Sequence, residues 1–329
     1  MTAPQPPALL PFAPAYFERL WGGTRLAPSP SATPIGEAWL VSDHAECQSV
    51  VSAGPHAGRT LGELVREYGA ALLGTAARTT RDGRFPLLLK LIDTADLLSV
   101  QVHPDDATAL ALGEADGGKT EMWHVLEAAP DSRIYCGLAP GGDASTFRLA
   151  MESGMVEPLL RSHAARPGDS FFVPAGMVHA IGKDILLAEI QQNSNITYRV
   201  FDWNRVDASG KPRQLHREKA LAATRFDMDC PGPSPAEVCS EDGRIRELLC
   251  SCPFFTAERR QASGEAVWEK DDRSFHILLA GDGGLELAAD SERARLAPGT
   301  AALVAGGVVR YSTHAPSPYL VYSVQEAMY

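Results

Sequence analysis

Short apolar stretches in which hydrophobic and polar residues alternate recur along the chain, and proline or glycine separates them. The alternation is clear at residues 99–103, 134–136, 170–173 and 196–201. Successive side chains of a β-strand point to opposite faces of a sheet, so each of these segments predicts a half-buried strand.

Helical spacing is limited to a few segments. Apolar residues recur at intervals of three and four over residues 61–73 and 144–162, and a shorter helix is expected at 217–223. Many short strands with few helices favour a mostly β protein built from barrels or jelly rolls, because a parallel sheet would need a helix after nearly every strand.

A break in this pattern falls at residues 226–240. The sequence Cys-Pro-Gly-Pro-Ser-Pro at 230–235 suits neither strand nor helix, and it predicts a loop or linker. Further short strands are expected beyond it, at 246–252, 275–279, 285–288, 301–304 and 319–324. We therefore expect two domains, a catalytic one over residues 1–228 and a smaller β-barrel over residues 229–329.

Composition narrows the choice of partners. The 329 residues carry 30 Lys and Arg against 41 Asp and Glu, a net charge of −11, which argues against nucleic acid or an anionic membrane as the main partner. No positively charged leader and no apolar run of about 18 residues is present, and the six cysteines lack Cys-x-x-Cys spacing. We expect free thiols, a cytoplasmic protein and a monomer; a zinc site among the last four cysteines is the alternative.

The segment Ser-Val-Gln-Val-His-Pro-Asp-Asp at 99–106 contains the first candidate site residues. Ser99, Gln101 and His103 share one face of the expected strand, and the two valines between them take the other. A polar face on an apolar strand needs a polar cavity to line. The alternative is a solvent-facing edge strand with a chance histidine.

The second candidate segment begins at Gly168 and continues to Pro-Ala-Gly-Met-Val-His at 174–179. A glycine, five residues and then Pro-x-Gly-x-x-His resembles the second motif of the cupin fold, whose histidine binds a metal inside a small jelly-roll barrel. His179 is then a metal ligand; the alternative is a capped histidine in a turn.

Gly-Lys-Thr-Glu-Met-Trp-His at 118–124 supplies a carboxylate. Glu121 and Lys119 lie on one face of an apolar strand, where an ionised side chain is costly to bury unless it is paired or bound to a metal. Together with His103, His179 and the Gln101 amide, Glu121 completes a mixed nitrogen and oxygen set. Such a set suits zinc or another divalent first-row ion with positions open for water or substrate.

Two cations interrupt other apolar strands. Arg199 lies in Thr-Tyr-Arg-Val-Phe-Asp-Trp at 197–203, and Lys90 lies in Pro-Leu-Leu-Leu-Lys-Leu-Ile-Asp at 86–93. Each either extends to the surface or faces an anion in a pocket. Lys219 is a further candidate for an anionic group.

These segments, in this order, resemble the type I mannose-6-phosphate isomerases in their short bacterial form. Trp-Gly-Gly at 21–23 and Gly-Glu-Ala-Trp at 36–39 extend the resemblance, which runs from about residue 12 to the C-terminus. The interval between Glu121 and His179 is too short for the helical insertion of the longer members. The sequence Leu-Val-Ala-Gly-Gly at 303–307 lacks the proline and histidine of a metal-binding cupin motif, so the resemblance assigns no metal to the second barrel.

The resemblance implies a double-cupin fold with one bound zinc ion, and it assigns roles to residues by motif position. The implied metal ligands are Gln101, His103, Glu121 and His179. The implied active-site cations are Arg199 and Lys119, and the implied pocket residues are Ser99 and Lys90. Whether Gln101 ligates the metal directly, and which group is the general base, stay open at this stage.

The expected reaction interconverts mannose 6-phosphate and fructose 6-phosphate through an enediol. Moving a proton between C1 and C2 needs an electrophile at the oxygens and a group that handles protons, and Lys119 is the first choice if its pKa falls near the metal. Two alternatives remain: another metal-dependent cupin enzyme on a phosphorylated sugar, such as an epimerase or oxygenase, and a non-catalytic cupin that binds sugar phosphates.

Overall fold

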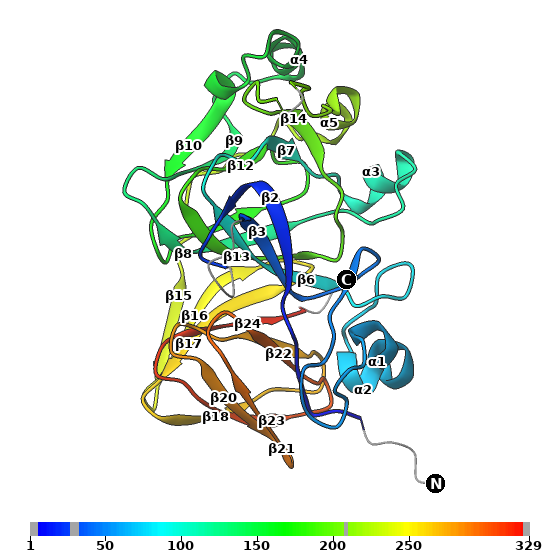
Figure 1. Cartoon of the computed structure of the whole chain (residues 1–329), viewed down its shortest axis with the longest axis vertical. Helices are drawn as coiled ribbons and strands as arrows, with labels where there is room; N and C mark the ends of the chain where they lie inside the picture. The colour runs from blue at the N-terminus through cyan, green and yellow to red at the C-terminus, as the bar shows by residue number, and fades with distance from the viewer. Residues whose placement is uncertain (1–5, 27–32, 207–209, 325–329) are drawn as a thin grey trace. The chain divides into compact units, whose positions relative to one another are not determined.

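The structure is a computed structural model that describes residues 6–26, 33–206 and 210–324, and it is mostly β, as the sequence predicts (Figure 1). Contacts divide the chain into two compact units. The first unit comprises Tyr16–Ala38 and Leu91–Ser234, and the second comprises Met1–Ala15, Trp39–Lys90 and Pro235–Tyr329. None of the helices in the described parts of the chain has the length and apolar character needed to cross a membrane.

The boundary near residue 234 lies close to the linker that the proline-rich segment predicts. The chain also passes between the units at residues 15/16, 38/39 and 90/91, and these positions fall inside the strands β2 (Ala15–Gly23), β3 (Ile35–Val41) and β6 (Leu87–Thr94). A crossing inside a continuous strand leaves no glycine or proline signal, which is why the sequence pattern shows only one of the four boundaries.

Two sheets contain the strands of the first unit, and three of these strands, β2, β3 and β6, contain residues of both units. The order in the five-stranded sheet is β10 (Leu160–Ala164), β9 (Arg133–Leu138), β12 (His179–Ile181), β7 (Val100–Val102) and β14 (Tyr198–Phe201). The order in the six-stranded sheet is β11 (Ser170–Val173), β8 (Glu121–Ala128), β13 (Ile185–Gln192), β6, β2 (Ala15–Gly23) and β3.

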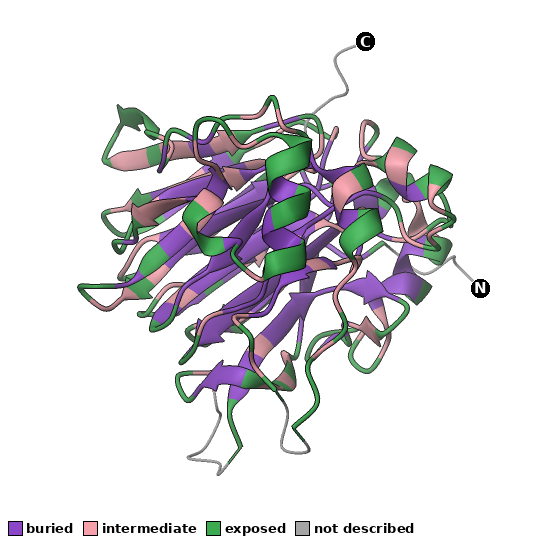
Figure 2. Ribbon diagram, turned by 90° about the horizontal axis from the view of Figure 1, so that it is seen from above, coloured by how far each residue is buried: buried purple, intermediate pink, exposed green. Residues whose placement is uncertain are grey.

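The core of the first unit lies between these sheets. Ile134 and Ile181 of the five-stranded sheet belong to the same buried cluster as Trp123, Phe171 and Leu187 of the six-stranded sheet. Each strand thus turns alternate side chains toward a shared apolar interior, as in a jelly roll. Figure 2 shows the strands buried along most of their length.

Helices cover the opposite face of the five-stranded sheet. Val100 and Val102 pack in one cluster with Phe147 of α4 (Ala144–Ser153) and Ala220 of α5 (Arg217–Ala223). Helix α5 matches its predicted range. The helix predicted at 144–162 is wrong in length: α4 ends at Ser153 because Gly154 adopts the left-handed conformation (φ 70°, ψ 23°), and a 3₁₀ turn at Glu157–Leu159 follows before β10.

The other predicted helix is broken into two pieces. Residues 61–73 form α1 (Leu61–Tyr68) and α2 (Ala70–Leu73), and Gly69 separates them with φ 49°. Helix α3 (Asp106–Ala111) has no counterpart in the pattern of apolar spacing, because only Ala109 is buried among its residues.

The strands of the second unit form sheets of seven and four, besides a short pair, β4 (Asp43–His44) and β5 (Cys47–Gln48). The order in the seven-stranded sheet is β1 (Leu9–Pro11), β22 (Ala301–Val304), β19 (His276–Leu279), β24 (Tyr319–Ser323), β17 (Thr256–Ala262), β16 (Arg244–Ser251) and β15 (Glu237–Glu241). The order in the other is β18 (Glu265–Glu269), β23 (Arg310–His314), β20 (Leu285–Ala289) and β21 (Glu292–Leu296).

A cluster of polar side chains lies in the interior of the second unit. Arg260 is 4% exposed and donates to the Tyr311 hydroxyl at 2.8 Å, and that hydroxyl lies 2.9 Å from Nδ1 of His276. The Arg260 guanidinium also lies over the Trp268 ring and pairs with Glu258. These side chains satisfy one another, so the buried charge is neutralised within the barrel.

Candidate metal centre

One row of side chains crosses four neighbouring strands of the five-stranded sheet. His179 on β12 lies opposite Cys136 on β9 and opposite Gln101 on β7, and Gln101 lies opposite Arg199 on β14. Directly opposed residues of neighbouring strands share a face, so all four side chains leave the sheet on one side. Because Cys136 belongs to the core between the two sheets, this is the inner face.

The facing sheet supplies the carboxylate. Glu121 begins β8 and lies between Val173 of β11 and Gln191 of β13, and it is fully buried. Lys119 comes two residues earlier, as the sequence analysis anticipates, and is 5% exposed.

Three of the sequence-predicted ligands come together. One ligand atom from each of His103, Glu121 and His179 lies within 4.8 Å of the others, and all three residues are buried. Nε2 of His103 is 3.7 Å from Oε2 of Glu121, and Nε2 of His179 is 3.3 Å from Oε1. Gln101 is the strand neighbour of His179, on the same face.

Both imidazoles are oriented by their other nitrogen. Nδ1 of His103 lies 2.7 Å from the Ile196 carbonyl oxygen, and Nδ1 of His179 lies 2.8 Å from that of Met177. A carbonyl can only accept, so each Nδ1 carries a proton, and in each ring Nε2 is the nitrogen on the side of Glu121. Burial lowers the pKa of His179 to about 3, which keeps it neutral.

This donor set fits a divalent metal ion. Two neutral imidazole nitrogens and one carboxylate are the ligands that zinc accepts in proteins, and the hydrogen bonds to main-chain carbonyls are the support that such histidines usually have.

Lys119 lies against the same group. Its Nζ is 2.5 Å from Oε2 of Glu121, 3.2 Å from Nε2 of His103 and 3.9 Å from Oε1 of Glu189. Burial alone would lower the pKa of the Lys119 ammonium, but the carboxylates of Glu121 and Glu189 outweigh it and raise that pKa above 10.5. This raised pKa describes the side chains alone, and the lowered pKa expected for Lys119 next to a bound metal ion stays a prediction.

Glu189 is a further site residue, to which the sequence pattern assigned no role. It lies opposite Trp123 on the neighbouring strand, accepts from the indole N–H at 2.9 Å and is 3% exposed. A carboxylate in the apolar run Leu-Leu-Ala-Glu-Ile is the same signal that singled out Glu121, so the sequence contained enough information to find it.

Arg199 is half-buried on β14. Its Nη1 donates to the Gln214 carbonyl oxygen at 2.9 Å, whereas its buried Nε–H has no hydrogen-bond acceptor among the described residues. Burial, with Arg213 adding to it, lowers the pKa of the guanidinium. A guanidinium with one buried donor to spare can receive an oxygen of a ligand.

The remaining predicted residues are less closely tied to the group. Ser99 is buried just before β7, two residues from Gln101. Lys90 belongs to the second unit, where its ammonium lies 4.7 Å from the centre of the Trp39 ring. Lys219 contacts Glu114 at 2.5 Å and already has a counter-charge.

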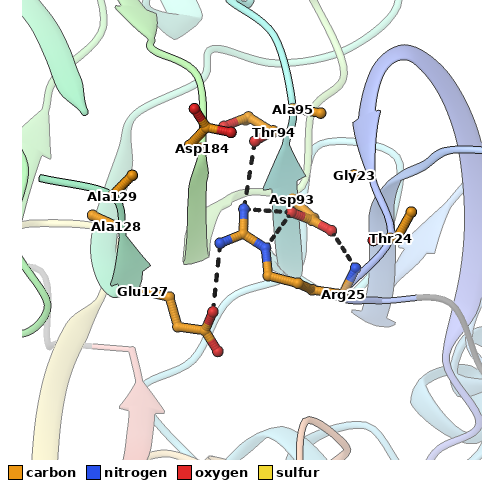
Figure 3. A pocket seen from close by; sticks show the side chains of 10 residues that line it. All are labelled: Gly23, Thr24, Arg25, Asp93, Thr94, Ala95, Glu127, Ala128, Ala129 and Asp184. Carbon is orange, nitrogen blue, oxygen red and sulfur yellow. Dashed lines mark hydrogen bonds and ion pairs between the residues drawn. The ribbon is translucent and has the colours of Figure 1, made fainter. Parts of the chain in front are cut away.

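A separate hollow of about 440 Å³ lies in the first unit beside the C-terminal ends of β2, β6 and β8 (Figure 3). Its arginine, Arg25, is committed to acidic partners: Nε donates to buried Asp93 at 2.7 Å, and Nη1 lies 3.5 Å from Glu127. Because the Arg25 guanidinium is already paired with carboxylates, this hollow favours an anionic ligand less than the surroundings of Arg199 do.

Fold and site together define a mostly β protein of the double-cupin type with a buried His–Glu–His group. Residues 9–122 match the family model of the phosphomannose isomerase type I catalytic domain. The chain is 39% identical to mannose-6-phosphate isomerase ManA of Bacillus subtilis over 83% of its own length and 85% of that protein. It therefore belongs to the type I mannose-6-phosphate isomerase family.

Solved structures agree. The crystal structure of the mannose 6-phosphate isomerase from Bacillus subtilis superimposes with a TM-score of 0.86 at 31% identity, covering 97% of this chain and all of that one. A zinc-bound mannose 6-phosphate isomerase superimposes with a TM-score of 0.76 over 97% of this chain and 100% of that chain; at 16% identity it supports the shared fold.

Proposed function

We propose that this protein is a zinc-dependent mannose-6-phosphate isomerase that converts mannose 6-phosphate to fructose 6-phosphate. One observation carries the proposal: in a member of this family, a buried His103–Glu121–His179 group lies beside the ammonium of Lys119. The free thiols of all six cysteines suit a reducing cytoplasm, where we propose that the enzyme acts as a monomer on its small substrate.

His103, Glu121 and His179 would hold the zinc ion, and Gln101, the strand neighbour of His179, is proposed as the fourth ligand. When bound, zinc would supply a Lewis acid that polarises the sugar carbonyl. Hydrogen bonds to main-chain carbonyls already orient the two imidazoles, so the protein need not rearrange them to accept the ion.

Two cations are proposed to act on the sugar. The spare N–H of Arg199 would donate to an oxygen that gains negative charge as the enediol forms, and preorganised donors of this kind are worth roughly 3 kcal/mol each. Ser99 and Lys90 are proposed to bind the substrate.

Proton handling divides between an acid and a base. Lys119 is proposed as the donor to a sugar oxygen, because its Nζ lies 2.5 Å from Glu121 and 3.9 Å from Glu189, and the two carboxylates favour the charged ammonium. Removal of the carbon-bound proton needs a base, and Glu189 is the nearby carboxylate outside the proposed ligand set.

A coupled assay tests the proposal. Purified protein is stripped with a chelator, reloaded with zinc and supplied with mannose 6-phosphate while fructose 6-phosphate is detected. We expect turnover that disappears with the chelator and returns with zinc. A zinc-loaded, folded protein without turnover would overturn the isomerase assignment.

Running the same reaction in D2O examines the proton route. An enediol whose proton passes through a side chain exchanges with solvent, so deuterium is expected at C1 or C2 of the product. Product free of deuterium would favour a hydride shift or a base shielded from solvent.

A further inference from the structure

β14 is an edge strand, and this feature bears directly on Arg199. It is the last strand in the order of its sheet, and β7 pairs with only one of its sides. On the other side, the main-chain groups of Arg199 need partners from elsewhere, because buried N–H and C=O groups are costly to leave unpaired.

His216 supplies both partners. Its main-chain N–H donates to the Arg199 carbonyl oxygen at 2.8 Å, and its side-chain Nδ1 accepts from the Arg199 main-chain N–H at 3.0 Å. The imidazole nitrogen therefore does what a carbonyl oxygen of a neighbouring strand would do. Nδ1 must carry a lone pair for this, so the proton of the neutral ring lies on Nε2.

The same short segment holds the guanidinium. The carbonyl oxygen of Gln214 accepts from Nη1 of Arg199 at 2.9 Å. Arg199 is thus held at three points, two on its main chain and one at the end of its side chain, all by residues 214–216.

This segment is itself fixed in place on both sides. Before it, Arg213 donates through Nε to the nearly buried Asp202 carboxylate at 2.7 Å. After it, helix α5 begins at Arg217 and packs on β14, and the His216 ring lies 6.4 Å from the ring of Tyr198. A residue held between two anchors can transmit little movement to the group it holds.

We propose that His216 is a positioning residue for Arg199: its Nδ1 and main-chain N–H fix the arginine so that the spare Nε–H faces the substrate oxygen. This inference rests on the proposed function, in which Arg199 acts on the sugar. His216 itself donates nothing to the substrate and acts through Arg199.

A double-mutant cycle tests it, with zinc-loaded H216A, H216N, R199A and H216A/R199A compared for kcat and KM on mannose 6-phosphate. We expect H216A to lower kcat by roughly 10- to 100-fold with little change in KM, because a misplaced donor loses stabilisation of the transition state. Asn has an oxygen near the place of Nδ1, so H216N is expected to recover most of the activity. In the R199A background, H216A is expected to cost about twofold or less.

The exposed His314 on β23 provides the control, and H314A is expected to match the wild type. Equal losses from H216A in both backgrounds, or an H216N variant as impaired as H216A, would overturn the positioning role.

A second readout does not depend on turnover. Hydrogen exchange at the Arg199 amide is expected to quicken in H216A and stay slow in H216N, because only the alanine variant lacks an acceptor. Unchanged exchange at the Arg199 amide in H216A would overturn the positioning role alone. A wild-type protein that lacks isomerase activity but shows slow exchange would overturn the proposed function, and with it the catalytic role of the contacts between His216 and Arg199.

Discussion

Lys119 stands out among the single residues because its ammonium is buried against carboxylates on two strands. We expect K119M to lower kcat by about 10²- to 10⁴-fold, the usual range for loss of a general acid, because methionine keeps the length of the side chain but carries no proton. The coupled assay measures this, and zinc analysis is expected to show unchanged metal content, since a protonated lysine has no lone pair to donate.

The exposed Lys183 serves as the matched control, and K183M is expected to behave as wild type. Activity of K119M within about threefold of wild type would remove Lys119 from the reaction.

His276 in the second unit gives a pH-dependent contribution to stability. Burial, reinforced by Arg260 and Lys270, lowers its pKa well below 6.5. Below pH 6.5, His276 binds a proton in the unfolded chain but stays neutral in the folded protein. Its contribution to the free energy of unfolding is therefore fully present above that pH and is lost progressively as the pH falls. We expect the drop in melting temperature between pH 7.5 and 5.5 to be smaller in H276N, measured by calorimetry.

H314N, at an exposed histidine, is expected to leave the drop unchanged. If the H276N and wild-type profiles run parallel, His276 contributes nothing to the acid sensitivity.

Sequence pattern finds residues whose chemistry is unusual for their surroundings, and it misses residues defined by a partner. Glu121 and Lys119 could be predicted because ionised groups in an apolar strand need an explanation. His216 could not, because its meaning depends on lying beside Arg199, and the approach of segment 214–216 to the edge of β14 is a tertiary contact with no local signature.

At the scale of elements, Gly154 decides where α4 stops. Apolar spacing continues past it through Val156 and Leu160, so the pattern alone extends the helix. The backbone at Gly154 is left-handed, which a side chain with a Cβ rarely adopts. We expect G154A to destabilise the protein by about 1–2 kcal/mol, measured by urea unfolding.

Asparagine tolerates this conformation better than alanine, so G154N is expected to lose less than G154A. Equal losses in the two variants would point to crowding by Asn204, which lies 3.3 Å from the position of an added Cβ, rather than to the backbone.

The positions of the strands and the faces of their side chains were predictable, because both follow from local backbone geometry. Alternation of side chains along the strand places Gln101 and His103 on one face and Val102 on the other. In the structure, Val102 packs against the helices on that other face. The pairing of His179 with Gln101, by contrast, joins segments far apart in sequence and depends on register across the sheet.

Taken as a whole, the first unit joins two sheets at the proposed metal site. His179 lies on β12 of the five-stranded sheet, His103 directly follows β7 of the same sheet, and Glu121 begins β8 of the six-stranded one. Binding to the folded state alone stabilises it by about 2.7 kcal/mol at a zinc concentration 100 times the dissociation constant. We expect zinc to raise the melting temperature of the stripped protein by roughly 5 °C or more in calorimetry.

H103A removes one ligand and is expected to show little or no shift. A shift of equal size in this variant would mean that zinc binds elsewhere.

The divided second unit has a consequence for synthesis on the ribosome. Leu72 and Leu73 are buried, and the main chain around them bonds to residues near 273–275 and 306, which emerge some 200 residues later. Synthesis proceeds at about 5–20 residues per second, so these apolar side chains stay without their native contacts for on the order of ten seconds or more. The nascent chain therefore exposes the apolar segment around Leu72 and Leu73 during most of translation. We expect the yield of folded protein in cells to depend on chaperones that bind this segment until the last strands are synthesised.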